Sequence, residues 1–182
     1  RNPLAPFTTS TLQQDASNKL GFGASRTMRI AQKLYEGINI GSETTGLITY
    51  MRTDGVQLSS QAIEELRNEI SNRHGKSYIP DNPRVYKSKA ANAQEAHEAI
   101  RPTDIARDPE SISSHLDAEQ FKLYDLIWKR TISSQMQSAE LDETAADISS
   151  KDQSITFRAN GSQVIFPGFF VYRDKEDDKL LP

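Results

Sequence analysis

Tyr50 and Arg52, two positions apart, are the residues of this sequence whose types and spacing suit a chemical reaction. Residues 47–55 read Leu-Ile-Thr-Tyr-Met-Arg-Thr-Asp-Gly and predict a short extended segment that ends in an Asp-Gly turn. Alternate side chains of an extended segment point the same way, so the phenol would lie beside the guanidinium. A fixed cation favours the phenolate and can hold a phosphate, as attack on a phosphodiester by tyrosine requires. The alternative is structural, with a packed ring and a solvated charge.

The composition narrows the possible classes of protein. The 182 residues suggest one or two domains, and 36% apolar residues with a mean hydropathy of −0.65 allow a lean core. With a net charge of −3, any affinity for nucleic acid must come from a local basic patch. The absence of cysteine excludes disulfides, thiolate metal sites and cysteine nucleophiles. No apolar run approaches the roughly 20 residues of a membrane span. Because the chain lacks an initial Met and ends among charged residues, we interpret it as part of a longer protein.

The first part of the chain predicts two helices joined by a glycine-containing turn. Ser10 and Gln13 form a capping box for the first helix, which Gly21 ends. The second helix is expected from Ser25 to Gly37. Its predicted apolar stripe consists of Met28, Ala31 and Tyr35.

One face of the second predicted helix is basic. Arg26, Arg29 and Lys33 are three and four positions apart, and Lys19 lies shortly before them. This face is the best candidate for a patch that binds nucleic acid in an otherwise acidic chain. The alternative is an ordinary solvated helix face.

Two longer helices are expected further along the chain. One begins after the N-cap residue Ser59, and the other follows a capping box formed by Asp117 and Gln120. Apolar residues recur at helical spacing in both, and we assign Trp128, the only tryptophan, to the core. The buried stripe predicted for the first of these helices is Ala62, Leu66 and Ile70.

A short alanine-rich helix is expected over residues 92–101, ended by Pro102. It would place His97 and Arg101 on one face, with Glu98 available to pair with the arginine. The sequence His-Glu does not continue into a zinc-binding His-Glu-x-x-His helix, because Arg101 stands where the second histidine is needed. We therefore predict no metal site in this chain.

The C-terminal part predicts antiparallel strands. Polar and apolar residues alternate over residues 153–159, which predicts a strand. Asn160-Gly161 is a typical hairpin turn, and residues 162–166 would form the second strand of the hairpin. A further strand is expected over residues 169–172. The expected fold class is therefore α+β, with a mainly helical domain followed by antiparallel strands.

Three motifs, residues 6–13, 47–54 and 94–102, together resemble the bacterial type IA DNA topoisomerases in order and spacing. The resemblance implies that Tyr50 is the nucleophile that becomes linked to a DNA 5′-phosphate, and that Arg52 positions this phosphate. It implies that His97 takes part in single-strand binding and proton movement. The residues expected to contact DNA are Thr9, Ser10, Thr11, Gln13, Arg26, Arg29, Lys33, Thr53 and Arg101.

The same resemblance implies the organisation of the parent protein. Residues 1–5 and 138–182 would belong to a β-rich arch, and residues 6–137 would form a helical gate domain. The parent would cleave one strand, pass a strand through the break and reseal it, relaxing negative supercoils without ATP. Its Mg²⁺ would be bound by a Toprim domain absent from this chain, so the isolated chain is expected to be inactive. We expect a monomer that prefers single-stranded DNA in the bacterial cytoplasm and nucleoid, away from membranes.

The sequence departs from the family pattern at two points. Gly55 stands where the family often has serine, and the loop over residues 39–46 is longer than expected. Two other functions are consistent with parts of the sequence. Residues 10–36 also fit a helix-turn-helix-like module that binds duplex DNA without chemistry. A plain structural domain would explain the helices and the hairpin, but not the three ordered motifs.

Overall fold

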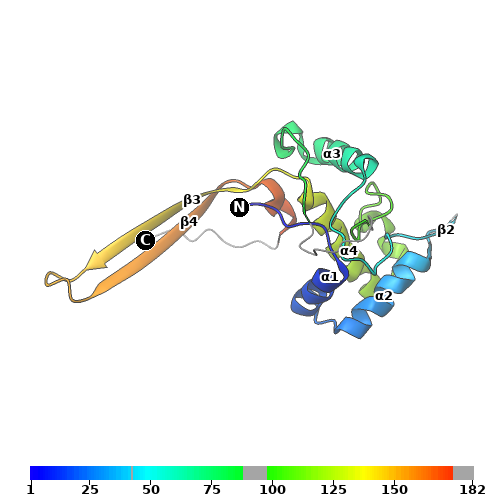
Figure 1. The fold of residues 1–182 in the computed structure, drawn as a ribbon, viewed down its shortest axis with the longest axis horizontal. Coiled ribbons are helices and arrows are strands. Elements are labelled where there is room, and N and C mark those ends of the chain that lie inside the picture. The colour runs from blue at the N-terminus through cyan, green and yellow to red at the C-terminus, as the bar shows by residue number, and fades with distance from the viewer. Residues whose placement is uncertain (42, 88–97, 174–182) are drawn as a thin grey trace.

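The computed structural model describes residues 1–41, 43–87 and 98–173, and these form a helical body from which a long β-hairpin projects (Figure 1). The fold is α+β, as the sequence predicts. No helix among these residues is long and apolar enough to cross a membrane. The α-helices are α1 (Thr9–Asp15), α2 (Ala24–Glu36), α3 (Ser60–His74) and α4 (Ala118–Ser134). The strands are β1 (Ile38–Asn39), β2 (Thr44–Thr45), β3 (Glu140–Ser149) and β4 (Thr156–Phe166). Short π- or 3₁₀-helical segments are η1 (Ala16–Leu20), η2 (Lys76–Tyr78), η3 (Glu110–His115) and η4 (Gly168–Tyr172).

The first helix begins earlier than the capping pattern predicts. Its N-cap is Thr8, whose hydroxyl accepts the Thr11 amide while the Thr11 hydroxyl accepts the Thr8 amide. The prediction of Ser10 as the N-cap is therefore wrong. The physical reason is tertiary, since Phe7 pairs with Ile100 and the helix starts directly after this bridge.

The buried face of α2 is rotated from the predicted stripe. Its buried residues are Thr27, Ile30, Ala31 and Leu34. Tyr35 is 40% exposed and Met28 only partly buried, so Ala31 is the one stripe residue that was predicted correctly.

Helices α3 and α4 confirm the predictions made for them. The Ser59 hydroxyl accepts the Ala62 amide, and the predicted stripe of α3 is buried. Asp117 and Gln120 form the predicted capping box of α4. Trp128 is buried as expected, and its indole Nε1 donates to the Ile105 carbonyl at 2.9 Å. α4 packs against both α2 and η4 and so forms the centre of the helical body.

The helix expected over residues 92–101 is wrong for the part that the structure describes, residues 98–101, and the earlier part lies outside the described residues. Ile100 pairs with Phe7, and Glu98 pairs with Gln57. These bridges to two distant segments override the helix propensity of Ala99.

The predicted hairpin exists, but its turn lies elsewhere. Asn160 and Gly161 stand inside β4, opposite Ala145 and Thr144, so the predicted turn there is wrong. The chain reverses over residues 150–155, where the Asp152 carboxylate accepts hydrogen bonds from the side chains of two neighbouring serines. These local hydrogen bonds fix the turn in a segment without the Asn-Gly pattern.

Residues 169–172 are helical rather than the predicted strand. Gly168 begins this turn at a φ of 49°, and a Cβ there would come within 2.4 Å of the Ser138 carbonyl oxygen. The Phe169 amide also donates to the Gln137 carbonyl. The chain thus turns back against the residues that precede β3, and these contacts hold residues 168–172 in a helical turn instead of a strand.

Candidate active site

The loop that carries Tyr50 (residues 46–53, the Tyr50 loop) is attached on one side to the end of α2. The Leu47 amide donates to the Leu34 carbonyl at 2.7 Å. A Cβ on Gly46 would lie 2.5 Å from the Tyr35 carbonyl oxygen, closer than real Cβ atoms come. The loop therefore contacts the helix end backbone to backbone, at a point that only glycine allows.

A second side of the loop is attached to residues 99–103. The Thr49 amide donates to the Arg101 carbonyl at 2.9 Å, and the Thr49 hydroxyl donates to the Ala99 carbonyl at 2.8 Å. The Thr103 amide donates to the Leu47 carbonyl at 3.0 Å. These bonds fix the backbone immediately before Tyr50.

The start of α1 holds the third side of the loop. The Thr9 hydroxyl donates to the Met51 carbonyl at 2.8 Å and accepts the Thr53 amide at 2.8 Å. The Thr9 amide donates to the Thr53 carbonyl at 2.9 Å. Thr9, predicted as a DNA contact, thus fixes the backbone immediately after Tyr50.

Tyr50 does not stand on the predicted strand. Ile48 alone makes a β-bridge, with Pro102, because the hydrogen bonds of this loop go to three different segments. Burial still alternates: Met51 and Thr53 are buried, whereas Tyr50 is 46% exposed and Arg52 is also exposed. The loop therefore presents a phenol and a guanidinium at the surface.

The ring of Tyr50 packs edge-on against Tyr35, with centroids 5.3 Å apart and planes at 65°. The sequence places Tyr35 in the buried stripe of α2 and so missed this contact. It could not have been found from the helical pattern, because it depends on how the loop returns to the helix end.

The other hydroxyls predicted to contact DNA are also used inside the protein. Thr11 belongs to the capping box of α1, and the Thr53 hydroxyl accepts the Gly55 amide at 3.0 Å. Ser10 is exposed with its hydroxyl 3.1 Å from that of Thr8, and Gln13 is partly buried.

Arg101 is held by a carboxylate. Its Nε and Nη2 donate to Glu98 Oε2 at 3.1 and 2.8 Å, the pairing that the sequence suggested. The other Glu98 oxygen accepts the Ser59 amide at 3.0 Å, at the start of α3. The structure therefore ties Arg101 to the helical framework. His97, which the sequence places near Arg101, lies outside the described residues.

The basic face of α2 is partly neutralised. Arg26 forms an ion pair with Glu119 and lies over the Phe22 ring, 4.6 Å from its centroid. The hydrogen bond between Arg26 and Glu119 raises the pKa of the arginine and lowers that of the carboxyl group. Within the described part of the chain, the exposed Arg29 and Lys33 have no ion-pair partner. Lys19 pairs with Asp15 at 3.7 Å, so the open basic surface is smaller than predicted.

No group of three or more His, Asp or Glu side chains in residues 1–41, 43–87 and 98–173 is arranged to hold a metal ion. The Mg²⁺ that the family resemblance implies therefore does not fit the described residues.

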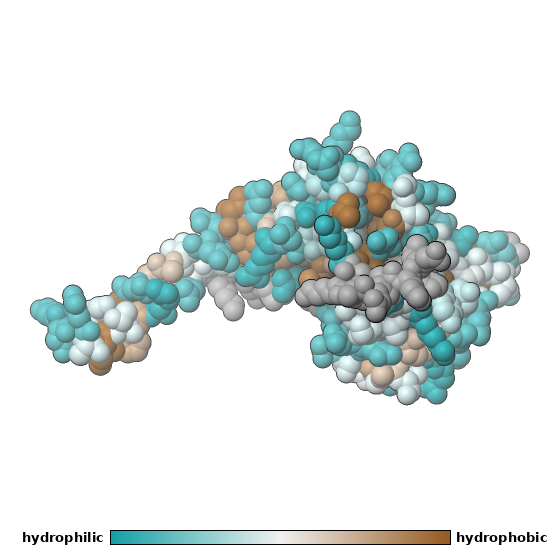
Figure 2. Space-filling view, viewed as in Figure 1, coloured by the Kyte–Doolittle hydropathy of each residue, from teal (hydrophilic) through white to brown (hydrophobic). Residues whose placement is uncertain are grey.

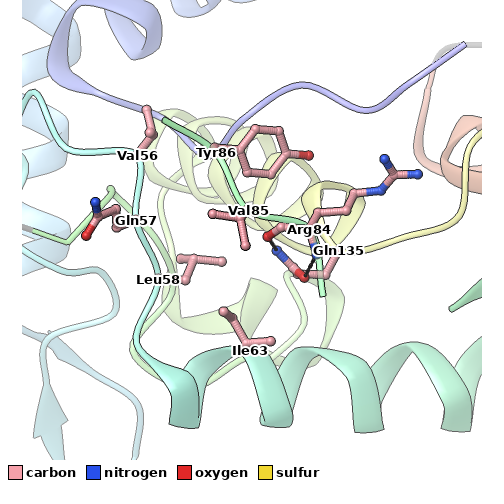
Figure 3. A pocket seen from close by; sticks show the side chains of 8 residues that line it. All are labelled: Val56, Gln57, Leu58, Ile63, Arg84, Val85, Tyr86 and Gln135. Atoms are coloured by element: carbon pink, nitrogen blue, oxygen red, sulfur yellow. Dashed lines mark hydrogen bonds between the residues drawn. The ribbon is translucent and has the colours of Figure 1, made fainter. Parts of the chain in front are cut away.

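A pocket of about 300 Å³ lies between the start of α3 and residues 84–86 (Figure 3). Its lining is Val56, Gln57, Leu58, Ile63, Arg84, Val85, Tyr86 and Gln135. The Arg84 guanidinium points away from it and donates to the Met136 carbonyl and the Ser138 hydroxyl. The pocket is mainly apolar and does not include Tyr50 or Arg52.

Comparisons with known proteins identify the family. The family model described as DNA topoisomerase matches residues 1–182. The chain is 54% identical to DNA topoisomerase 1 of Rickettsia felis over 189 residues, covering 100% of this chain and 24% of that protein. It is 51% identical to DNA topoisomerase 1 of Xylella fastidiosa (strain Temecula1), covering 98% and 22% respectively.

A solved structure of full-length topoisomerase I from Thermotoga maritima is similar to the chain with a TM-score of 0.84 at 40% identity. The match covers 100% of this chain and 29% of that one. The chain spans about a quarter of the length of the curated relatives it matches. With its whole length matched by the family model and its fold shared with a solved member, this chain belongs to the bacterial type IA DNA topoisomerases.

Proposed function

We propose that this chain is the nucleophile-bearing part of a type IA DNA topoisomerase, with Tyr50 as the residue that breaks and reseals one DNA strand. The observation that carries the proposal is an exposed phenol on a loop whose backbone is fixed on three sides, with the exposed Arg52 two residues away. Such a loop holds a nucleophile in place while leaving it open to a large substrate.

The proposed reaction exchanges one phosphate ester for another. The Tyr50 oxygen, after loss of its proton, attacks the phosphorus, and the 3′-oxygen of the neighbouring nucleotide leaves with a proton. The DNA is then joined through its 5′-phosphate to the tyrosine. Arg52 would stabilise the negative charge that develops on the phosphate oxygens. Because the ester bond is conserved in the phosphotyrosine, attack by the 3′-hydroxyl restores the strand without ATP.

Arg29 and Lys33 would supply part of the DNA-binding surface, since both are exposed and neither forms an ion pair within the described residues. The exposed Ser10 and the partly buried Gln13 would add polar contacts at the start of α1. Thr9, Thr11 and Thr53 would act mainly through the loop and helix start that they fix. His97, outside the described residues, and Arg101 keep the roles that the resemblance implies.

The proposed domain division follows the joint between the helical body and the hairpin. The Ala139 amide donates to the Arg1 carbonyl, so the N-terminus meets the base of β3 (Figure 1). This supports the assignment of residues 1–5 and 138–182 to an arch and of residues 6–137 to the gate. The remaining arch and a Mg²⁺-binding Toprim domain would come from the rest of the parent protein. A monomer that acts on the bacterial nucleoid in the cytoplasm fits this substrate.

Replacing the phenol tests the proposal in the full-length parent. Tyr50→Phe is expected to abolish relaxation of negatively supercoiled plasmid, because phenylalanine has no oxygen to attack phosphorus. Tyr78→Phe is a matched control, since Tyr78 is partly buried and its ring contacts the rings of His74 and Phe166. Relaxation by Tyr50→Phe at the wild-type rate would refute the assignment.

Binding experiments separate this proposal from a helix-turn-helix-like module. The topoisomerase proposal predicts preference for single-stranded over duplex oligonucleotides, with a log-log salt slope of about 0.7 per phosphate contact. A duplex-binding module would show the opposite preference and would not respond to Tyr50→Phe.

A further inference from the structure

The last turn of α2 contacts the loop that carries Tyr50 in two ways, through a side chain and through the backbone. The Tyr35 ring packs edge-on against the Tyr50 ring. Tyr35 is 40% exposed, so its ring contributes little to the core. Its contact with the Tyr50 ring lies at the surface of the protein. Such aromatic pairs prefer a defined edge-to-face geometry, which restricts the orientation of both rings.

The backbone contact is made four residues before Tyr50. Gly46 does not have a positive φ, so its conformation alone does not demand glycine. The requirement comes from the approach to Tyr35, whose carbonyl oxygen would lie 2.5 Å from a Cβ at this position. The adjacent hydrogen bond from the Leu47 amide to the Leu34 carbonyl fixes the position of the loop against the end of α2.

We infer that Tyr35 and Gly46 are positioning residues for the attack by Tyr50. Gly46 lets the loop dock on α2, and the Tyr35 ring then fixes the direction of the Tyr50 phenol. This inference rests on the proposed function of Tyr50, and it assigns a role to the Tyr35 ring rather than to the Tyr35 hydroxyl.

The expected consequence is a change in the chemical step rather than in DNA affinity. An exposed tyrosine side chain can adopt several rotamers, and attack requires its oxygen to lie in line with the bond that breaks. A neighbouring ring that excludes the wrong rotamers increases the fraction of bound complexes ready to react. DNA affinity depends mainly on phosphate contacts and should change little.

The test uses the full-length parent and a single-stranded oligonucleotide labelled at its 3′ end at saturating concentration. The single-turnover rate of covalent adduct formation is measured beside the Kd from fluorescence anisotropy. Tyr35→Ala is expected to slow adduct formation roughly two- to tenfold, the range expected from loss of an aromatic pair. Tyr35→Phe keeps the ring and is expected to stay close to the wild-type rate. Tyr35→Leu serves as the ring-free variant if thermal unfolding shows that the alanine variant is not folded.

Glycine substitutions test the backbone contact. Gly46→Ala is expected to slow adduct formation at least as much as Tyr35→Ala, because the added methyl group must displace the loop or the helix end. Gly23→Ala is the matched control: Gly23 has an ordinary φ of −64°, and a Cβ there would have no atom within 4 Å. The control is expected to retain the wild-type rate.

The outcomes separate this inference from the proposed function. Adduct formation by Tyr50→Phe would refute the proposed function itself. If Tyr50→Phe is inactive but ring-free Tyr35 variants react at the wild-type rate, only the positioning role is refuted. An equal loss in Tyr35→Phe would assign the effect to the hydroxyl, and a change confined to Kd would assign it to DNA binding. Either result would overturn the inference.

Discussion

The Tyr50 loop and the β3–β4 hairpin both expose aromatic side chains to solvent, but their backbones are stabilised by different contacts. The loop buries its own Met51 side chain and is hydrogen-bonded to three segments distant in sequence. The hairpin strands pair mainly with each other, and apolar side chains near its end remain exposed (Figure 2). These include Ile148, Ile155 and Phe157, exposed by 62%, 55% and 70%.

The Tyr50 loop is therefore packed within the helical body, whereas the outer part of the β3–β4 hairpin leaves apolar side chains uncovered. Isolated two-stranded hairpins are marginally stable in water, so the outer hairpin gains little from its own contacts. Ile148 and Phe157 are direct cross-strand partners, while the next pair, Asp147 and Arg158, is joined by an ion pair. Because adjacent pairs face opposite sides of the hairpin, one side has an apolar pair and the other a charged pair. The apolar side fits the proposal that further arch residues of the parent cover it.

The largest difference in stability is expected between truncation of a buried side chain in the Tyr50 loop and truncation of an exposed one in the hairpin. Met51→Ala should reduce the free energy of unfolding by about 2–5 kcal/mol, because it leaves a cavity beneath the Tyr50 loop. Phe157→Ala should change it by no more than about 0.5 kcal/mol, because this ring is mostly exposed. Urea unfolding of the chain measures both. Equal losses would show that the hairpin is packed as tightly as the loop, contrary to the comparison.

A smaller effect is expected from the hydroxyl that fixes the loop after Tyr50. Thr9→Val keeps the shape of the side chain but leaves the Met51 carbonyl and the Thr53 amide without this partner. The expected loss is about 1–3 kcal/mol of unfolding free energy. Ser10→Ala, which removes an exposed hydroxyl from the same helix, is the matched control with a loss within about 0.5 kcal/mol. Similar values for the two variants would mean that Thr9 does not hold the loop.

The smallest expected effect lies at the contact between α3 and η4. His74 on α3 hydrogen-bonds the Tyr172 hydroxyl at 2.8 Å, and burial together with Arg73 lowers the pKa of His74 below its usual 6.5. Burial also raises the pKa of Tyr172 to about 12, so this phenol remains neutral throughout the relevant range.

The unfolded chain therefore binds a proton at His74 more readily than the folded chain does. Stability should be constant above about pH 6.5 and fall as the pH drops from there through the lower pKa of the folded state. His74→Gln should show a smaller decrease between pH 7.5 and pH 5 in urea unfolding. Identical pH profiles for the wild type and the variant would show that His74 does not contribute to the pH dependence of stability.

The elements predicted correctly are those defined by neighbouring residues. The caps at Ser59 and Asp117 and the buried stripe of α3 depend on spacing within one helix. The turn at Asn160-Gly161 failed because ten strand pairs fixed a different register, placing these residues inside β4. Local preference was overridden there by the pairing of the whole hairpin.

The sequence predicted which residues of the candidate site could react, but it did not predict the tertiary contacts that hold them in place. The motif around Tyr50 and Arg52 identified the nucleophile and the cation that we propose. It did not reveal that Thr9 fixes the loop, or that Gly46 and Tyr35 dock it on α2, since these contacts join segments between 11 and 44 positions apart in the sequence. Such contacts depend on tertiary packing, which a local pattern does not contain.

The isolated chain offers a simple check on what the rest of the parent must supply. Incubated with single-stranded DNA and Mg²⁺, it is expected to form no covalent adduct, because the described residues offer no metal site. Denaturing electrophoresis with a 3′-labelled oligonucleotide detects an adduct directly. Its appearance would mean that the Tyr50 region reacts without the proposed Toprim domain.

The most direct test of the central claim is to map the residue that carries the DNA. The adduct of the full-length parent is trapped by denaturation and digested with nuclease and trypsin, and the modified peptide is fragmented in a mass spectrometer. Cleavage after Lys33 and Arg52 releases residues 34–52, which contain both Tyr35 and Tyr50. We predict that the nucleotide 5′-phosphate is attached to Tyr50. Attachment to Tyr35, or to a peptide outside residues 34–52, would contradict the account.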